Sequence, residues 1–326
     1  MKRFVYRLVL FCVLPMVALI PLAYMVDAGL QRSRSFLYAE WNDLFAGRIQ
    51  ADMLFMGSSR SWVHFSPQIM DSALGVNTYN LGLDGTPLDL QFERLKIYLR
   101  YNKMPKYIVQ EVGLNTAMSR SKELPHYEQF LPYLADTAMW RIYSSMYPGV
   151  SVADRFFPLY KYNNQLPLIK EGIMSYLGRG VKAVKYKGYE GRLLTWDNAF
   201  DEMVRQNPNG MSLAIEPEAI ALLNEYVQFC KDNGVRLILV YSPCYYEATA
   251  FIKNMDQVMG VLRDMSVKYE VPLLDHTHTY IDSNKAYFYN SQHLNKQGSE
   301  LFSRMLAQQI APYIKDTAAH PAGMRQ

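Results

Sequence analysis

The stretch Asp52-Met53-Leu54-Phe55-Met56-Gly57-Ser58-Ser59-Arg60 sets the architecture, because an apolar run passes directly into a small polar turn. The apolar residues predict a buried strand, and Gly57 allows the backbone to turn tightly at its end. In sheets of parallel strands, ligands bind at the carboxyl ends of the strands. Ser58 and Ser59 therefore lie at the end of the strand where a ligand would bind.

Similar apolar runs recur along the chain and alternate with helical patterns. Strands are predicted at residues 76–79, 107–112, 236–241 and 271–275, and helices after Gly85, at 218–233, at about 254–269 and from Asn295 onward. Alternating strands and helices predict an α/β fold with a parallel sheet covered on both faces.

The helix after Gly85 has clear start signals. Thr86 is the candidate N-cap, Pro87 suits the first helical position, and Asp89 occupies the acidic place of a capping box. Three of the predicted strands end in turns rich in Gly, Ser and Asn. One edge of the sheet should therefore gather polar groups.

The N-terminus predicts the compartment. Leu8 to Val26 is a run of nineteen residues without a charge, preceded by Lys2, Arg3 and Arg7. About 20 apolar residues span a bilayer, and a basic flank stays in the cytoplasm. A cleaved signal peptide is the alternative, but its apolar core is usually about 7–15 residues and ends in a small-x-small site. We expect a single-pass transmembrane anchor, with the following domain extracytoplasmic, either periplasmic or extracellular.

The remaining organisation follows from composition. We expect an anchor at 1–27, a polar helical stalk at 28–48, an α/β domain formed by 49–116 and 217–316, and a disordered tail at 317–326. Residues 117–216 hold many aromatics, scattered prolines and a Gly/Lys-rich section. They predict a mostly helical insertion.

Composition excludes several classes of function. The net charge of +4 and the pI near 8.7 are too weak to indicate a nucleic-acid partner. Walker, dinucleotide and kinase motifs are absent, so no cofactor is expected.

Cys230 and Cys244 could pair in an exported chain, although two separate thiols are the default. His276 and His278 form a His-x-His pair that is more often an exposed loop than a metal site.

Four groups converge at the predicted strand ends. Acyl transfer needs a nucleophile, a base, and donors where negative charge develops on the carbonyl oxygen. Ser59 offers the nucleophile, His293 before the last helix offers the base, and Gly85 and Asn115 offer N–H donors. Each alone is more often an ordinary turn or structural residue. The hypothesis of an acyl-transfer site rests on the occurrence of all four, in order, at predicted strand ends.

These motifs resemble those of the SGNH (GDSL-like) hydrolase superfamily. Its Gly-Asp-Ser turn is matched by Gly57-Ser58-Ser59, its Asn-x-x-x-x-Gly element by Asn80 to Gly85, its Gly-x-Asn by Gly113-Leu114-Asn115, and its Asp-x-x-His by Asn290-Ser291-Gln292-His293. The turn, the anchor and the His-Leu-Asn ending resemble the exported branch. That branch includes proteins that help to move D-alanine onto teichoic acid or acetyl groups onto alginate.

The resemblance implies a three-layer, flavodoxin-like domain and a role for each residue. Ser59 would be the nucleophile, with Ser58 as the runner-up, and His293 the base. The N–H groups of Ser59 and Gly85 and the amide of Asn115 would form the oxyanion hole. Asn290 stands where the family has the triad acid, and asparagine cannot stabilise an imidazolium by charge.

The function expected from these features is an esterase or O-acyltransferase. It would act on acyl groups of a cell-surface or exported carbohydrate through a serine acyl-enzyme, with a membrane-bound acyl-transfer partner implied by the resemblance. The alternative is a catalytically impaired relative that binds a glycan or a membrane partner during assembly of a surface polymer. Asn290 is the feature that favours the alternative.

Overall fold

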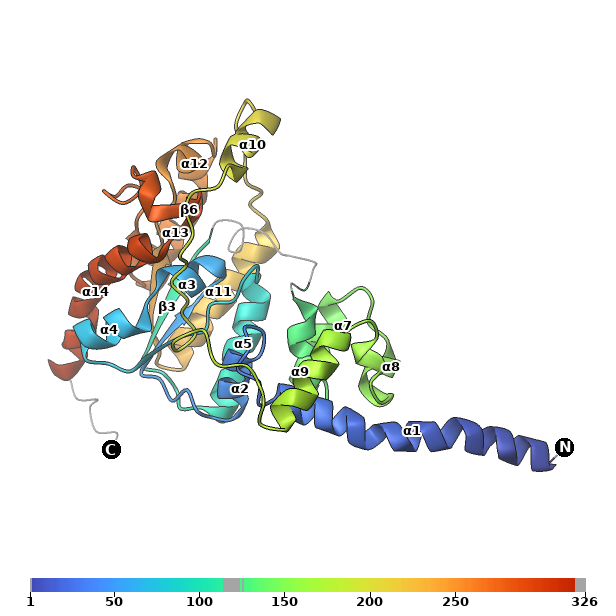
Figure 1. Cartoon of the computed structure of the whole chain (residues 1–326). Helices are drawn as coiled ribbons and strands as arrows, with labels where there is room; N and C mark the ends of the chain where they lie inside the picture. Colours follow the sequence, from blue (N-terminus) through green and yellow to red (C-terminus); the bar gives the residue numbers. More distant parts are fainter. Residues whose placement is uncertain (1, 114–123, 125, 320–326) are drawn as a thin grey trace. The chain divides into compact units, whose positions relative to one another are not determined.

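A computed structural model describes residues 2–113, 124 and 126–319, without the side chains of 5, 8–10, 12, 15 and 315–319. Its contacts divide the chain into two compact units (Figure 1). Residues 1–48 and 122–184 form one, called here the helical unit. Residues 49–121 and 185–326 form the other, called here the sheet unit.

The sheet unit is built on five parallel strands. They are β1 (Met53–Met56), β2 (Thr78–Asn80), β3 (Tyr107–Glu111), β4 (Arg236–Tyr241) and β5 (Leu273–Asp275). Their order across the sheet is β2-β1-β3-β4-β5, and every neighbouring pair is parallel. The α/β fold with a parallel sheet is therefore confirmed.

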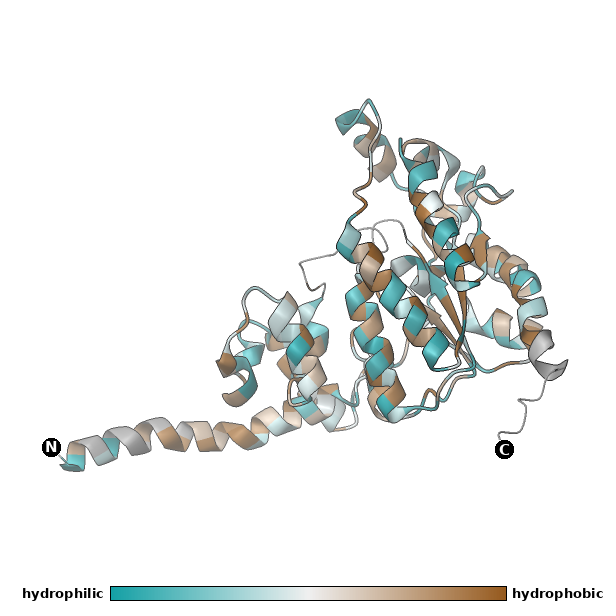
Figure 2. Ribbon diagram, turned by 180° about the vertical axis from the view of Figure 1, so that it is seen from behind, coloured by the Kyte–Doolittle hydropathy of each residue, from teal (hydrophilic) through white to brown (hydrophobic). Residues whose placement is uncertain are grey.

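Helices cover both faces of this sheet. One face packs on α3 (Ser59–His64), α4 (Pro67–Leu74) and α14 (Lys296–Ala319), and the other on α5 (Leu88–Tyr101), α11 (Pro217–Asp232) and α13 (Met255–Tyr269). Alternate strand residues such as Phe55, Val109 and Val240 share a buried core with Phe302 of α14. Figure 2 shows the covering helices striped with hydrophobic and hydrophilic residues, as one-sided burial requires.

The strand order places a switch point between β1 and β3. In doubly wound sheets the connections diverge to opposite faces there, which leaves a crevice beyond the strand ends. The turn after β1 lies at this point. Gly57 has a φ of +146°, and a Cβ atom on it would lie 2.8 Å from the Cβ of Glu111. Only glycine fits this turn, because both the backbone angle and the close approach exclude a side chain.

Asn80 holds the start of α3 against the end of β2. Its fully buried amide donates to the carbonyls of Ser61 at 2.7 Å and Phe65 at 2.9 Å, and accepts from the N–H of Gly82 at 2.8 Å. These bonds fix the backbone of α3 and of the turn after β2 to one buried side chain. The position of α3, and of Ser59 at its first residue, depends on them.

Shorter elements complete the sheet unit beyond the strand ends. They are α10 (Ala199–Gln206), α12 (Tyr246–Ala250), η3 (Lys285–Tyr287) and an antiparallel pair, β6 (Phe288–Asn290) with β7 (His293–Leu294).

The start of α5 differs from the sequence expectation. Pro87, not Thr86, is the N-cap residue, because the Thr86 hydroxyl donates to the carbonyl of Leu83 at 2.7 Å instead of capping the helix.

The helical unit contains α1 (Lys2–Leu30), α2 (Ala39–Phe45), η1 (Tyr127–Tyr133), α7 (Thr137–Met146), α8 (Val152–Phe156), η2 (Tyr160–Tyr162) and α9 (Leu166–Tyr176). Residues expected to form a polar stalk supply core side chains here. Trp41 is buried and packs on Phe130 and Tyr133. Gly29 and Gly172 let α1 and α9 approach closely, since a Cβ on Gly29 would lie 1.8 Å from the Gly172 carbonyl oxygen.

Among the described side chains, no helix is both long and apolar enough to cross a membrane. The expected span, Leu8–Val26, lies within α1, and its side chains at 8–10, 12 and 15 lie outside the described residues.

Two further expectations concern the tail and the cysteines. Residues 320–326 of the expected tail lie outside the described residues. Cys230 and Cys244 are both buried free thiols, in line with the default interpretation.

Candidate active site

Ser59 lies at the carboxyl end of β1, as the first residue of α3. Its Oγ is 2.7 Å from Nε2 of His293, although the two residues are 234 positions apart in the chain. This is the hydrogen-bond distance expected of a nucleophile and its base. Ser59, not Ser58, makes this bond. Ser58 is buried beside it and precedes the helix as its N-cap residue.

Asn290 determines which nitrogen of His293 carries the proton. Its Oδ1 lies 2.9 Å from Nδ1 of His293 and also accepts the backbone N–H groups of Gln292 at 3.1 Å and His293 at 3.0 Å. Two fixed N–H donors orient the amide so that its oxygen faces the ring. Nδ1 must therefore donate, and Nε2 is left free to accept the proton of Ser59. The pairing of β6 with β7 sets Asn290 opposite His293.

The expected oxyanion donors come from the ends of β2 and β3. Gly85, with a left-handed φ of +64°, and Gly113 line the same cavity as Ser59. The structure therefore brings Ser59, His293, Asn290 and Gly85 together at one end of the sheet. Asn115 lies outside the described residues.

The residue after Ser59 forms a buried ion pair. The guanidinium of Arg60 bonds the carboxylate of Glu111, and the two side chains are 6% and 0% exposed. The same guanidinium donates to Sγ of Cys244 at 2.8 Å and stacks 4.6 Å from the ring centre of Tyr241. Burial raises the pKa of Glu111, and the charge of Arg60 opposes that rise.

His64 extends this network to the histidine strand. Its Nε2 accepts the backbone N–H of Leu294 at 2.9 Å, so its Nδ1 donates to Oγ of Ser242, also at 2.9 Å. Ser242 in turn donates to Glu111 at 3.3 Å. Burial lowers the pKa of His64 well below its usual value, and the neighbouring His293 and Arg60 lower it further. A neutral, fully buried histidine thus ties β7 to α3.

The sequence interpretation missed this network. Arg60 was noted only as part of the turn, and His64 and Ser242 carried no motif. One signal was available, because Glu111 is a charged residue at the end of a strand that is buried throughout. A buried carboxylate requires a partner.

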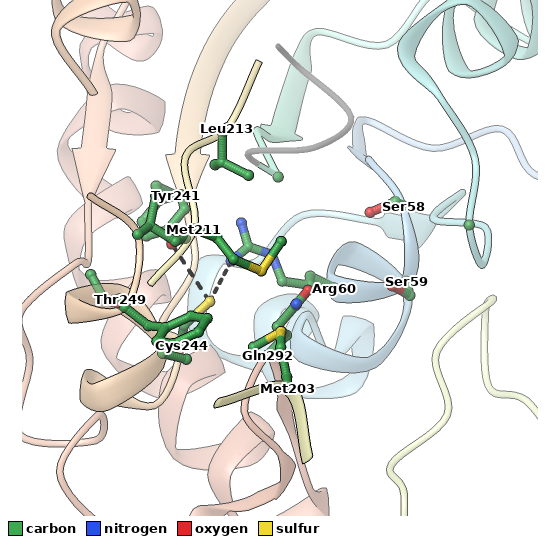
Figure 3. A pocket seen from close by; sticks show the side chains of 15 residues that line it. Ser58, Ser59, Arg60, Met203, Met211, Leu213, Tyr241, Cys244, Thr249 and Gln292 are labelled. Carbon is green, nitrogen blue, oxygen red and sulfur yellow. Dashed lines mark hydrogen bonds between the residues drawn. The ribbon is translucent and has the colours of Figure 1, made fainter. Parts of the chain in front are cut away.

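A cavity of about 350 Å³ opens beside Ser59 (Figure 3). Ser58, Ser59, Arg60, Gly85, Gly113 and Gln292 line it at the strand ends. Its remaining walls are Met203, Met211, Leu213, Tyr241, Cys244, Ala248, Thr249, Phe251 and Ile252. The volume lies within the usual range of small-molecule sites, about 300–1,000 Å³.

His293 is electrically neutral at physiological pH. Burial lowers the pKa of its imidazole to about 4, and the positive charge of Arg60 adds to this effect. The carboxylates of Asp84 and Asp197 act in the opposite direction. The ring stacks on Tyr289 with 5.3 Å between centroids. A neutral imidazole with Nε2 facing a hydroxyl can act as a general base.

The other candidates of the sequence play different parts. His276 is not an exposed loop residue. It is buried, and its ring nitrogens bond the Tyr241 carbonyl at 3.0 Å and Gln309 Oε1 at 2.7 Å. His278 is exposed. Within the described part of the chain, no group of three or more His, Cys, Asp or Glu side chains could hold a metal ion.

No family model and no curated protein matches this sequence. Among solved structures, the chain resembles a GDSL-like lipase from Bacteroides thetaiotaomicron, with a TM-score of 0.38 and 10% identity over 81% of this chain and 88% of that one. It also resembles a catalytic mutant of an acetylxylan esterase from Geobacillus stearothermophilus (TM-score 0.38, 14% identity, 79% and 93% covered). A third is an acetyl xylan esterase (TM-score 0.41, 10% identity, 80% and 98% covered). At these values the matches assign no chemistry to this chain.

The titration of His293 tests the electrostatics of the site. Because the folded-state pKa is depressed, the ring should stay neutral as the pH falls through 6.5 and should protonate only near pH 4. NMR observation of the imidazole, assigned with a His293→Gln variant, should give a midpoint near 4. A midpoint at or above 6.5 would contradict the description of the site.

Proposed function

We propose that this chain is a serine esterase or O-acyltransferase of the SGNH type. The observation that carries the proposal is the hydrogen-bond chain from Ser59 through His293 to Asn290. It presents the correct tautomer for proton abstraction, at the edge of a cavity large enough for an acyl group. The motif resemblance supports the same assignment.

The proposed reaction proceeds in two halves. Ser59 Oγ forms a bond to the acyl carbonyl carbon, and its proton passes to Nε2 of His293. The N–H groups of Ser59 and Gly85 face the oxygen on which negative charge develops, and the motif adds the amide of Asn115. The ester C–O bond then breaks, and His293 returns the proton to the departing alcohol. Water or a sugar hydroxyl then gives its proton to His293 and forms a bond to the acyl carbon. The bond from that carbon to Ser59 Oγ breaks, and His293 returns the proton to Ser59 Oγ.

Asn290 keeps His293 in the orientation that the reaction needs, but it limits the rate of the proposed reaction. It orients His293 and selects the tautomer, but it has no charge with which to stabilise the imidazolium that forms as Ser59 attacks. The rival proposal is an impaired relative that binds a glycan or a membrane partner. The missing carboxylate is the specific observation that favours it.

A carbohydrate is the proposed acyl carrier. In support, the surroundings of His293 are polar, with Tyr289 stacked on the ring and the charges of Asp84 and Asp197 acting on it. Hydroxyl-rich alcohols suit such a surface, because carboxylates and phenols can accept their hydrogen bonds. The resemblance to exported polysaccharide-modifying proteins points the same way, and it implies a membrane-bound acyl-transfer partner.

The proposed location is the outer side of the cell membrane, with residues 8–26 as a single-pass anchor. The uncharged run of nineteen residues and its basic flank support this proposal. In the described part of α1, apolar side chains such as Phe11, Leu14 and Val17 are exposed. Such side chains would be covered by lipid in a membrane helix.

An active-site serine probe tests the nucleophile. A fluorophosphonate should label the wild type and the Ser58→Ala variant at Ser59, because only Ser59 is bonded to His293. Ser59→Ala should remain unlabelled, as read by mass spectrometry of the labelled peptide. If Ser58→Ala abolishes labelling and Ser59→Ala does not, the nucleophile is assigned wrongly.

Asn290→Asp separates an enzyme from an impaired relative. A carboxylate would stabilise the imidazolium, and because the tautomer is already correct, the gain in kcat on ester substrates should be about 10²-fold. The added charge should also raise the pKa of His293, which would move the acid limb of kcat/KM upward from about pH 4.

Two controls accompany this measurement. Ser59→Ala should abolish hydrolysis in both backgrounds, and Asn284→Asp, in the neighbouring loop, should change neither kcat nor the acid limb. If wild type and Asn290→Asp are both inert on esters and both unlabelled at Ser59, the binding protein is the better description.

Fractionation tests the anchor. The intact chain should remain with membranes after a carbonate wash, and external protease should digest residues after about 27. Replacing Leu14 and Val17 with Lys should release the chain or block its export, whereas the same change at the exposed Val267 should not. A mature soluble form that starts near residue 28 would show cleavage instead.

A further inference from the structure

The cavity beside Ser59 is mostly apolar away from Ser58, Ser59, Arg60 and Gln292. Tyr241 and Cys244 form part of its wall, and the rest comes from two segments, residues 203–213 and 248–252, whose lining side chains are apolar except for Thr249. Apolar walls of this kind favour a ligand that buries hydrocarbon. The catalytic steps proposed above need no such surface, so it calls for a separate explanation.

Backbone hydrogen bonds hold these two segments together. The N–H of Met211 donates to the carbonyl of Phe251 at 3.0 Å, and the N–H of Lys253 donates to the carbonyl of Met211 at 2.8 Å. Asn254 adds two bonds to the backbone of Leu213, both 2.9 Å long. The ring of Phe200 in α10 also packs on Phe251. The wall is thus built before any ligand arrives, which lowers the entropic cost of binding.

The position of His293 indicates which part of an ester would enter the cavity. His293 must return a proton to the departing alcohol, so the alcohol has to lie beside its ring. That ring stacks on Tyr289, and neither residue lines the cavity. Ser59 and Gly85, two of the expected oxyanion donors, do line it. The acyl side of the carbonyl is therefore the part that extends into the apolar space.

We infer that this cavity binds an acyl chain of medium length, about six to ten carbons, so that the preferred substrates carry acyl groups longer than acetyl. An apolar cavity of about 150 Å³ already accommodates benzene, and this one measures about 350 Å³. An acetyl group would leave most of it unfilled. The inference rests on the proposed function, because it assumes an ester bound at Ser59.

Thr249 brings a hydroxyl to the wall formed by residues 248–252. It is buried, it lines the cavity, and its Oγ1 makes no hydrogen bond to the described residues. A buried hydroxyl without a partner weakens the contact with hydrocarbon, because water bound there must be displaced. Thr249→Val keeps the shape of the side chain and removes that group. It should therefore favour long acyl chains still more strongly.

A series of p-nitrophenyl esters tests the inference on the full-length chain. From acetate through butyrate and hexanoate to octanoate, kcat/KM should rise about fourfold per methylene until the cavity is full. Ala248→Phe, which fills the cavity, should lower the octanoate-to-acetate ratio at least tenfold. Met211→Ala, which enlarges it, should move the optimum to longer chains. Val267→Trp, on the exposed side of α13, should leave the ratio unchanged.

The outcomes distinguish this inference from the proposed function. If acetate is hydrolysed in a Ser59-dependent way, with a flat or falling chain-length profile and no effect of Ala248→Phe, the acyl-chain assignment is overturned and the esterase stands. If Ala248→Phe does not fold, Leu213→Trp at the half-buried rim gives the same test. If no ester is cleaved and no probe labels Ser59, the proposed function fails, and this inference fails with it.

Discussion

The buried ion pair between Arg60 and Glu111 links the elements that carry the candidate site. Arg60 follows Ser59 in α3, and Glu111 ends the neighbouring strand β3, so the pair joins the two elements on either side of the switch point. Both charges are buried, and removal of one partner from such a pair typically costs about 3–5 kcal/mol. Gly57 belongs to the same arrangement, because its missing side chain lets the turn approach Glu111.

The same buried charges shape the chemistry above them. Glu111 is bonded to Ser242, Ser242 to His64, and His64 to the backbone of β7. The strand that carries His293 is therefore held relative to Ser59 through side chains that do not line the cavity. The positive charge of Arg60 also disfavours protonation of His293. With Asn290 as the neutral partner of His293, the site combines the geometry of a serine triad with a weak base. The turnover of the proposed enzyme would depend on how much imidazolium character the reaction requires.

Much of the fold was readable from local patterns. Apolar runs that alternate with helical stretches located all five strands, and the Gly-Ser-Ser turn placed Ser59 at the end of β1. The motif from Asn290 to His293 identified His293 as the candidate base, through the resemblance to the Asp-x-x-His motif of the family. The network of Arg60, Glu111, Ser242 and His64 was not readable, because its members are separated by up to 182 residues and each is an ordinary polar residue in its own segment. The packing of residues 28–48 also escaped, since Trp41 and Tyr38 become core residues only against η1.

The amino-acid sequence alone thus specifies the alternation of elements, the glycine turns and the identities of the candidate site residues, because periodicity and turn chemistry are local properties of the chain. Three-dimensional packing settles the rest. Which nitrogen of His293 is protonated follows from two N–H donors on Asn290 Oδ1, and the shape of the apolar cavity follows from hydrogen bonds between residues 211–213 and 251–254. Both depend on which segments meet, and that is determined by burial of charge and hydrocarbon across the whole sheet unit.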